Sequence, residues 1–155
     1  MTPDSDLCPC CSGRSYQGCC QPLHIGDLSA SSAEQLMRSR YSAFCVANSN
    51  YLMTTLHPDY RTDGEETALR HTIQQTRWLG LKIIQHTPGF EVATVEFVAF
   101  HGGQPFEQLH ELSRFVKQEG QWLYTDGNYL PPVKLNRNET CFCGSSKKYK
   151  KCHGK

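Results

Sequence analysis

The chain has 155 residues, of which 38% are hydrophobic and 20% charged, and its formal net charge is +1. This composition is typical of a globular protein and excludes an intrinsically disordered chain. The sequence contains no run of about 18 apolar residues, which excludes a membrane-spanning helix. Residues 1–6 are acidic and precede no apolar stretch, so we expect no signal peptide and a cytoplasmic protein.

The near-neutral total conceals an uneven distribution of charge. Residues 134–155 carry seven basic side chains against one acidic one, a formal charge of +6, whereas residues 1–24 carry −1. The middle of the chain is therefore acidic, at −4. A basic tail on an acidic body predicts that the tail contacts an anionic partner.

The first element in chain order is a cluster of cysteines. Cys8-Pro9-Cys10 is followed, after eight residues, by Cys19-Cys20. In a reducing compartment, clustered thiols are more typical of metal ligands than of disulfides. Cys11 is a further thiol in this segment, and its role is left open.

Residues 30–130 predict helices followed by strands. Ser31-Ser32-Ala33-Glu34 forms a capping box at the start of a helix that continues to about Ala47, with apolar residues at helical spacing. Cys45 lies on the apolar face of this helix, so we expect a small core residue there. Two shorter helices are expected at residues 50–56 and 65–75.

Beyond the last helix the apolar period changes to two. Four runs rich in aromatic and β-branched residues predict strands at residues 78–86, 90–101, 106–118 and 121–126. Gly102-Gly103 and Glu119-Gly120 supply hairpin turns between them. Helices first and an antiparallel meander second place the chain in the α+β class.

Some polar residues fall on otherwise apolar strand faces, where they could line a pocket: Glu96, His110, Arg114, Tyr124 and Asp126. A carboxylate near an arginine and a histidine can perform acid–base chemistry. Glutamate and arginine on neighbouring strands also form simple cross-strand pairs. An enzyme or small-molecule binder that uses this pocket is the alternative to a binding module.

The C-terminal segment repeats the first cluster. Cys141-Phe142-Cys143 is followed, after eight residues, by Cys152-His153, and Gly144 provides the backbone freedom that a tight turn needs. The predicted ligands are four thiolates in one site and three thiolates and an imidazole in the other: Cys8, Cys10, Cys19, Cys20, Cys141, Cys143, Cys152 and His153.

Zinc fits both ligand sets, because it takes four sulfur or imidazole ligands in tetrahedral geometry. We therefore expect two zinc ions with structural roles, since neither site leaves an open position. Disulfides, an iron–sulfur cluster and unmetallated reactive thiols are the alternatives. We also expect the ends of the chain, rather than its middle, to depend on metal for their structure.

Four lysines lie between the C-terminal ligand pairs: Lys147, Lys148, Lys150 and Lys151. Zinc would hold them as a defined patch that binds an acidic protein surface, or a ribosome or RNA through its phosphates. A solubilising basic tail is the simpler alternative.

Residues 137–153 resemble the SEC-C motif, which is found at the C-terminus of the SecA translocase ATPase. Phe142 and Ser146 stand where proline and glycine are usual, and Cys11 takes the glycine position of the N-terminal copy. The SecA motif is linked to the SecB chaperone and to ribosomes. The resemblance therefore implies partners of the chaperone, secretion or ribosome type.

The whole chain resembles the YchJ family. The resemblance depends on two SEC-C motifs that flank residues 36–41, 78–81 and 111–122. It implies a middle domain of the nuclear transport factor 2 (NTF2)-like fold, a curved sheet wrapped by helices into a cone. The implied organisation is residues 1–28, 29–132 and 133–155.

Overall fold

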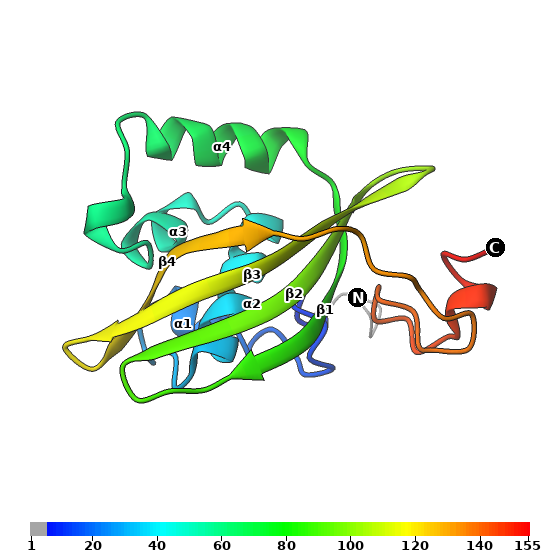
Figure 1. Ribbon diagram of the computed structural model, residues 1–155, viewed down its shortest axis with the longest axis horizontal. Helices are drawn as coiled ribbons and strands as arrows, with labels where there is room; N and C mark the ends of the chain where they lie inside the picture. The colour runs from blue at the N-terminus through cyan, green and yellow to red at the C-terminus, as the bar shows by residue number, and fades with distance from the viewer. Residues whose placement is uncertain (1–5) are drawn as a thin grey trace.

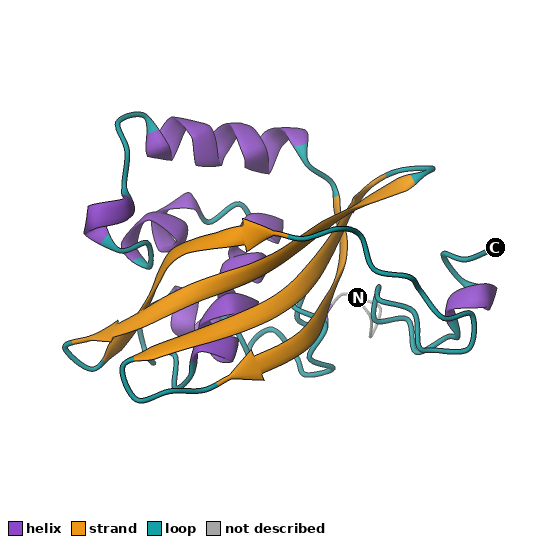
Figure 2. Ribbon diagram, viewed as in Figure 1, coloured by secondary structure: helices purple, strands orange, loops and turns teal. Residues whose placement is uncertain are grey.

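The computed structural model describes residues 6–155, and it confirms the predicted α+β class. The helices are α1 (Gln21–His24), α2 (Ala33–Cys45), α3 (Ser49–Thr54) and α4 (Glu65–Gln75), with 3-10 turns η2 (Pro58–Tyr60) and η3 (Tyr149–Lys151). The strands are β1 (Trp78–Thr87), β2 (Val92–Gly102), β3 (Phe106–Gln118) and β4 (Gln121–Tyr129). They form one antiparallel, twisted sheet in the order β1-β2-β3-β4 (Figures 1 and 2). The sequence did not predict α1 or the two 3-10 turns.

Helix α2 begins within one residue of the predicted start, with Ser32 and Gln35 rather than Ser31 and Glu34 at the cap, and it packs against one face of the sheet. The Ser32 side chain caps it by accepting a hydrogen bond from the Gln35 amide at 3.1 Å. Leu36, Met37 and Tyr41 are buried in the main core.

The expectation that Cys45 is a core residue is wrong, because this side chain is exposed. Cys45 is the last residue of α2, and Val46 beyond it is exposed as well. Ala47 then takes a left-handed conformation, with φ of 61°, and turns the chain into α3. The apolar residues that predicted the helix therefore continue in the sequence beyond Cys45, where the helix ends.

Strand β2 is buried on both of its faces. Val95, Phe97 and Ala99 belong to the main core beneath the helices, which we call the inner face. Val98 and Phe100 point the other way and belong to a second core, which the C-terminal segment covers. We call this second side the outer face.

Helix α4 is the most loosely attached of the four α-helices. It contains no buried residue, and only Leu69 and Ile73 pack partly against the main core. Figure 1 shows α4 at the margin of the molecule, separate from the sheet. Within residues 6–155, no helix is both long enough and apolar enough to cross a membrane.

The N-terminal segment is part of the main core. Cys8, Cys10, Cys20 and Leu23 are buried in the same cluster as Leu36 of α2. The predicted division at residue 28 stays a prediction, but the segment before it packs as an integral layer beside α2. This contact changes the expected effect of metal removal.

Candidate metal centres and the surfaces around them

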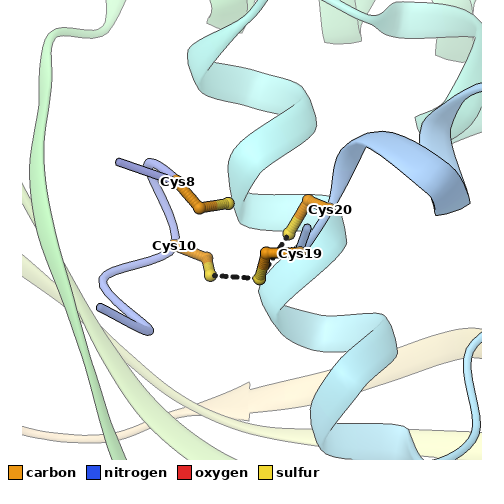
Figure 3. Close-up of side chains that lie close together, drawn as sticks. All are labelled: Cys8, Cys10, Cys19 and Cys20. Carbon is orange, nitrogen blue, oxygen red and sulfur yellow. Dashed lines mark hydrogen bonds between the residues drawn. The ribbon is translucent and has the colours of Figure 1, made fainter. Parts of the chain in front are cut away.

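The first candidate metal centre gathers the four N-terminal cysteines. The turn at residues 8–10 and the start of α1 bring four thiols together beside α2 (Figure 3). Their sulfur atoms all lie within 4.8 Å of one another, with 3.6 Å between Cys10 and Cys19 and 3.9 Å between Cys19 and Cys20. Three of these residues are buried, so the centre is largely shielded from solvent.

The second candidate centre has the same construction at the other end of the chain. Cys141, Cys143, Cys152 and His153 place their ligand atoms within 4.8 Å of one another. The Cys143 and Cys152 sulfurs are 3.6 Å apart, and His153 Nδ1 lies 3.3 Å from the Cys141 sulfur. The imidazole thus faces the cluster through Nδ1.

The two segments share a backbone as well as a ligand spacing. The Cys8 amide donates to the Arg14 carbonyl at 2.8 Å, and the Cys141 amide donates to the Lys147 carbonyl at 2.7 Å. Ser12 lies 3.2 Å from the Cys19 sulfur, just as Ser145 donates to Cys152 at 3.5 Å. The repeat expected from the sequence is therefore a structural repeat.

Both turns use left-handed residues at matching positions. Cys11 (φ 64°) corresponds to Gly144 (φ 83°), and Gly13 (φ 84°) corresponds to Ser146 (φ 69°). The conformation is one that glycine adopts without strain and other residues adopt rarely. The departures from the usual glycines therefore leave the path of the turn unchanged.

The distances fit a tetrahedral metal ion and exclude disulfides. With 2.3 Å from metal to sulfur, tetrahedral geometry places neighbouring sulfurs about 3.8 Å apart. The 3.6 and 3.9 Å separations match this edge. A disulfide needs about 2.05 Å, and all nine cysteines are free. Each cluster can hold one metal ion.

The ionisation of the thiols also suits a cation. Hydrogen bonds with Cys10 and Cys20 lower the pKa of Cys8 to about 3, while bonds with Cys10 and Cys8 raise that of Cys20. The hydrogen bond from Ser145 is the main cause that lowers the pKa of Cys152 to about 6, and burial raises that of Cys141 to about 11. In each cluster one cysteine loses its proton readily, whereas another has a raised pKa and resists ionisation. A divalent ion removes that resistance and releases protons.

Cys11 is not a fifth ligand. Its thiol donates to the Phe142 carbonyl at 3.5 Å, so it bridges the two metal motifs. Burial raises its pKa. Both motifs thus lie at the same end of the sheet, on either side of a groove of about 980 Å³ whose walls include Trp78 and Leu81.

The C-terminal motif is held against the outer face of the sheet by an aromatic stack. The Phe142 and Phe100 rings are 3.7 Å apart and nearly parallel, at 8°. Gly80 of β1 lets the Phe142 backbone approach, because an added Cβ would lie 2.7 Å from the Phe142 carbonyl carbon. Lys82 also forms an ion pair with Glu139. Phe142, in place of the usual proline, therefore docks the motif.

The structure does not gather the predicted pocket residues into one pocket. Glu96 and His110 lie on the outer face, where His110 Nε2 is 2.7 Å from Glu96 and Nδ1 is 2.6 Å from the Pro131 carbonyl. Arg114 pairs with Asp126 at 2.7 Å on the same face, with both side chains at least 40% exposed. These are two cross-strand pairs, the simpler of the two interpretations.

Tyr124 is the exception, because it lies on the inner face. Arg114 pairs with Asp126 and Phe115 pairs with Tyr124, which leaves Thr125 as an extra residue in β4. Such a β-bulge breaks the two-residue alternation, so Tyr124 and Asp126 face opposite ways. Of these two predicted pocket residues, only Tyr124 therefore lies with Trp122 on the inner face.

Sequence reasoning missed the polar residues of the inner face. Glu111 and Ser113 are buried beside Tyr124, and Arg40 of α2 lies over its ring at 4.9 Å. The available signal was the two-residue spacing that places Glu111 and Ser113 on the same face of β3 as Leu109 and Phe115. These residues line a separate cavity between the sheet and α2.

An NTF2-like domain with a SEC-C motif is the class that this fold and these sites define. The family described as "YchJ, middle NTF2-like domain" matches residues 32–127, and the SEC-C motif matches residues 137–155. A UPF0225 protein of Geobacter sulfurreducens is 42% identical and one of Pectobacterium carotovorum 41%, each over 97% of this chain and 99% of the relative. The chain belongs to this family of YchJ-like, UPF0225 proteins.

Two solved structures share the fold. A SEC-C motif-containing protein from Psychrobacter arcticus has a TM-score of 0.68 and 32% identity, over 95% of this chain and 94% of that one. The SEC-C motif-containing protein RPA3114 from Rhodopseudomonas palustris has a TM-score of 0.72 and 34% identity, over 77% and 95%.

Proposed function

We propose that the protein is a zinc-stabilised binding module that presents its basic C-terminal turn to an acidic protein surface. The observation that carries this proposal is the lysine patch, defined as Lys147, Lys148, Lys150 and Lys151, on a turn that is fixed at both ends. Zinc bound by four protein ligands supplies folding energy and leaves no open position for catalysis.

Support for zinc comes from the donor sets. Four thiolates in one site and three thiolates and an imidazole in the other are typical of structural zinc. The sulfur separations match the tetrahedral edge, and the buried thiols are shielded from oxidants. Tetrahedral sulfur sites also accept iron, so the metal is identified by analysis of the purified protein.

The backbone of the lysine patch is tied to the metal turn. Besides the backbone bond between Cys141 and Lys147, the Tyr149 amide donates to the Glu139 backbone carbonyl at 2.7 Å. The Lys150 amide donates to the Arg137 backbone carbonyl at 3.0 Å. Across residues 6–155, no ammonium group of the patch forms an ion pair with a carboxylate. The backbone that carries the charges is thus held in place, and the ammonium groups are free to meet a partner.

The aromatic residues of the motif favour a protein partner over an RNA. Phe142 is 6% exposed and stacks on Phe100, so it cannot stack on a base. Tyr149 is half-buried in the same outer core. Single-stranded RNA readers depend on exposed aromatic rings. The remaining RNA outcome is binding through phosphates alone, with a steep dependence on salt.

Reversing all four patch lysines to glutamate should weaken association at least about tenfold, because each exposed charge contributes only part of the binding energy. Zinc content should stay unchanged, since none of the four is a ligand. The measurement is a binding curve for candidate acidic proteins, ribosomes and RNA at several salt concentrations. The control reverses Arg70 and Lys117, two exposed charges on the body. If the four-glutamate variant binds every partner as the parent does, the patch is only a solvated surface.

A further inference from the structure

A cavity of about 250 Å³ lies between the inner face of the sheet and α2. Its walls are mostly apolar and aromatic, including Met37, Phe97 and Phe115. Binding pockets for small molecules combine such walls with a few polar groups at fixed positions. At about 30 Å³ for each non-hydrogen atom, this volume holds a molecule of about eight such atoms.

Glu111 provides the main polar group in the cavity wall. Only 8% of this residue is exposed, and its Oε2 accepts hydrogen bonds from the Tyr124 hydroxyl at 3.0 Å and from Ser113. No residue within 6–155 donates a hydrogen bond to the other oxygen, Oε1. Oε1 keeps accessible surface, so water or the hydroxyl of a ligand can donate to it.

The fold makes room for this carboxylate. Gly127 of β4 lies against the Glu111 side chain, and a Cβ added there would be 2.5 Å from Oε2. Any other residue at position 127 would push the carboxylate from its place. Glu111 is therefore accommodated because Gly127, in the neighbouring strand, has no side chain.

Arg40 offsets the charge of Glu111. Its Nη1 donates to the Leu52 carbonyl at 2.8 Å and to Thr55 at 2.6 Å, which fixes the guanidinium over the Tyr124 ring. Burial lowers the pKa of Arg40 to about 10, so it stays protonated at neutral pH. One cation and one anion line the cavity, which favours an uncharged ligand.

A second wall residue also lacks a partner. The indole Nε1 of Trp78 is buried, and no acceptor among residues 6–155 reaches it. An indole nitrogen can only donate. The indole nitrogen therefore does not open onto the cavity, although the Trp78 ring forms part of its wall, and the wall offers Glu111 Oε1 as a free acceptor. A hydroxyl group can both donate and accept.

We propose that this cavity binds a small, uncharged, mostly apolar alcohol or phenol whose hydroxyl donates to Glu111 Oε1. The site is independent of the lysine patch, because the patch lies on the C-terminal motif and the cavity lies on the inner face. Helix α4 contributes Thr72 to the wall. Because this helix has no buried residue, it is the element that a ligand can displace most easily on its way into the cavity.

Benzyl alcohol and ethylbenzene test this proposal, since both have eight non-hydrogen atoms and only the first has a hydroxyl. The experiment titrates each into the zinc-loaded, ¹⁵N-labelled full chain and follows the indole resonances of Trp78 and Trp122. Benzyl alcohol should shift the Trp78 resonance saturably, well beyond any shift of Trp122. Ethylbenzene should bind about tenfold more weakly or not at all.

Three variants complete the design. Glu111→Gln should weaken benzyl alcohol binding about fivefold, because a charged acceptor becomes a neutral one. Glu96→Gln, on the outer face, should leave it unchanged. Ala99→Leu fills the cavity from β2 and should abolish the response while the spectrum shows a folded chain.

The proposal is overturned if Trp78 responds to neither probe. It is also overturned if both probes bind equally, or if Glu111→Gln and Glu96→Gln behave alike. The four-glutamate patch variant should bind benzyl alcohol as the parent does, so failure of one proposal is distinct from failure of the other.

Discussion

Replacing Cys10 by serine should destabilise the whole protein rather than its N-terminal segment alone. Cys10 is completely buried, and its cluster belongs to the same core as α2 and the inner face of the sheet. Arg38 of α2 also donates to the Cys10 carbonyl at 2.8 Å. Loss of the metal would leave unpaired thiols in that core. We expect the free energy of unfolding to fall by at least about 3 kcal/mol, a large part of a typical total.

Chemical denaturation followed by far-UV circular dichroism, in excess zinc, measures this effect. Cys143→Ser serves as the comparison, because its cluster lies on the outer face and should mainly loosen residues 137–155. Cys45→Ser, at an exposed position, controls for the loss of a thiol. An unchanged unfolding midpoint for Cys10→Ser would show that the N-terminal metal is dispensable for the core.

Replacing Gly80 by alanine should displace the C-terminal motif from the sheet. The new Cβ would meet the Phe142 backbone, which cannot turn aside as a flexible side chain can. Overpacking of this kind costs about 1–3 kcal/mol or more, enough to offset the stacking of Phe142 on Phe100. The ligands all lie within residues 141–153, so the motif should keep its metal.

Hydrogen exchange of the backbone amides in residues 139–150 measures this displacement. Those amides should exchange faster in Gly80→Ala, while the amides of β3 keep their protection. Gly103→Ala is the matched control, since nothing lies within 4 Å of its added Cβ. Equal exchange in the two variants would mean that β1 and the motif adjust together. The docking of Phe142 would then not require a glycine at position 80.

Most of the fold could be predicted from the sequence because its local signals agree with the tertiary structure. The helix at residues 65–75 and the strand at residues 106–118 have the predicted bounds. The serine cap of α2, found at Ser32, and the left-handed turn at Glu119-Gly120 also act locally. The eight candidate ligands could be selected for a similar reason, since one short pattern with a definite chemistry occurs twice.

The inner-face cavity could not be found in the same way. A period of two shows which residues share a face of a strand, but it does not show which face the helices cover. On β2 both faces are apolar, because Phe97 meets α2 and Phe100 meets the C-terminal motif. The extra residue at Thr125 then reverses the alternation in β4. These are long-range properties, and they placed Glu111 rather than Glu96 beside Tyr124.

The packing of the N-terminal motif into the main core also depends on the tertiary structure. Residues 1–24 and residues 134–155 have matching ligand patterns, and the pattern alone does not show which part of the fold each segment covers. The structure distinguishes them, because one is buried beside α2 and the other is docked on the outer face. Which face a metal turn covers depends on its few apolar side chains, such as Leu23 and Phe142.

Native mass spectrometry of protein purified without chelator shows directly whether the chain holds two tetrahedral metal sites. We expect two zinc ions per chain, one in Cys20→Ser and one in Cys152→Ser, because each variant removes a single ligand set. One zinc or fewer in the parent after reconstitution, or stoichiometric iron, would contradict this expectation.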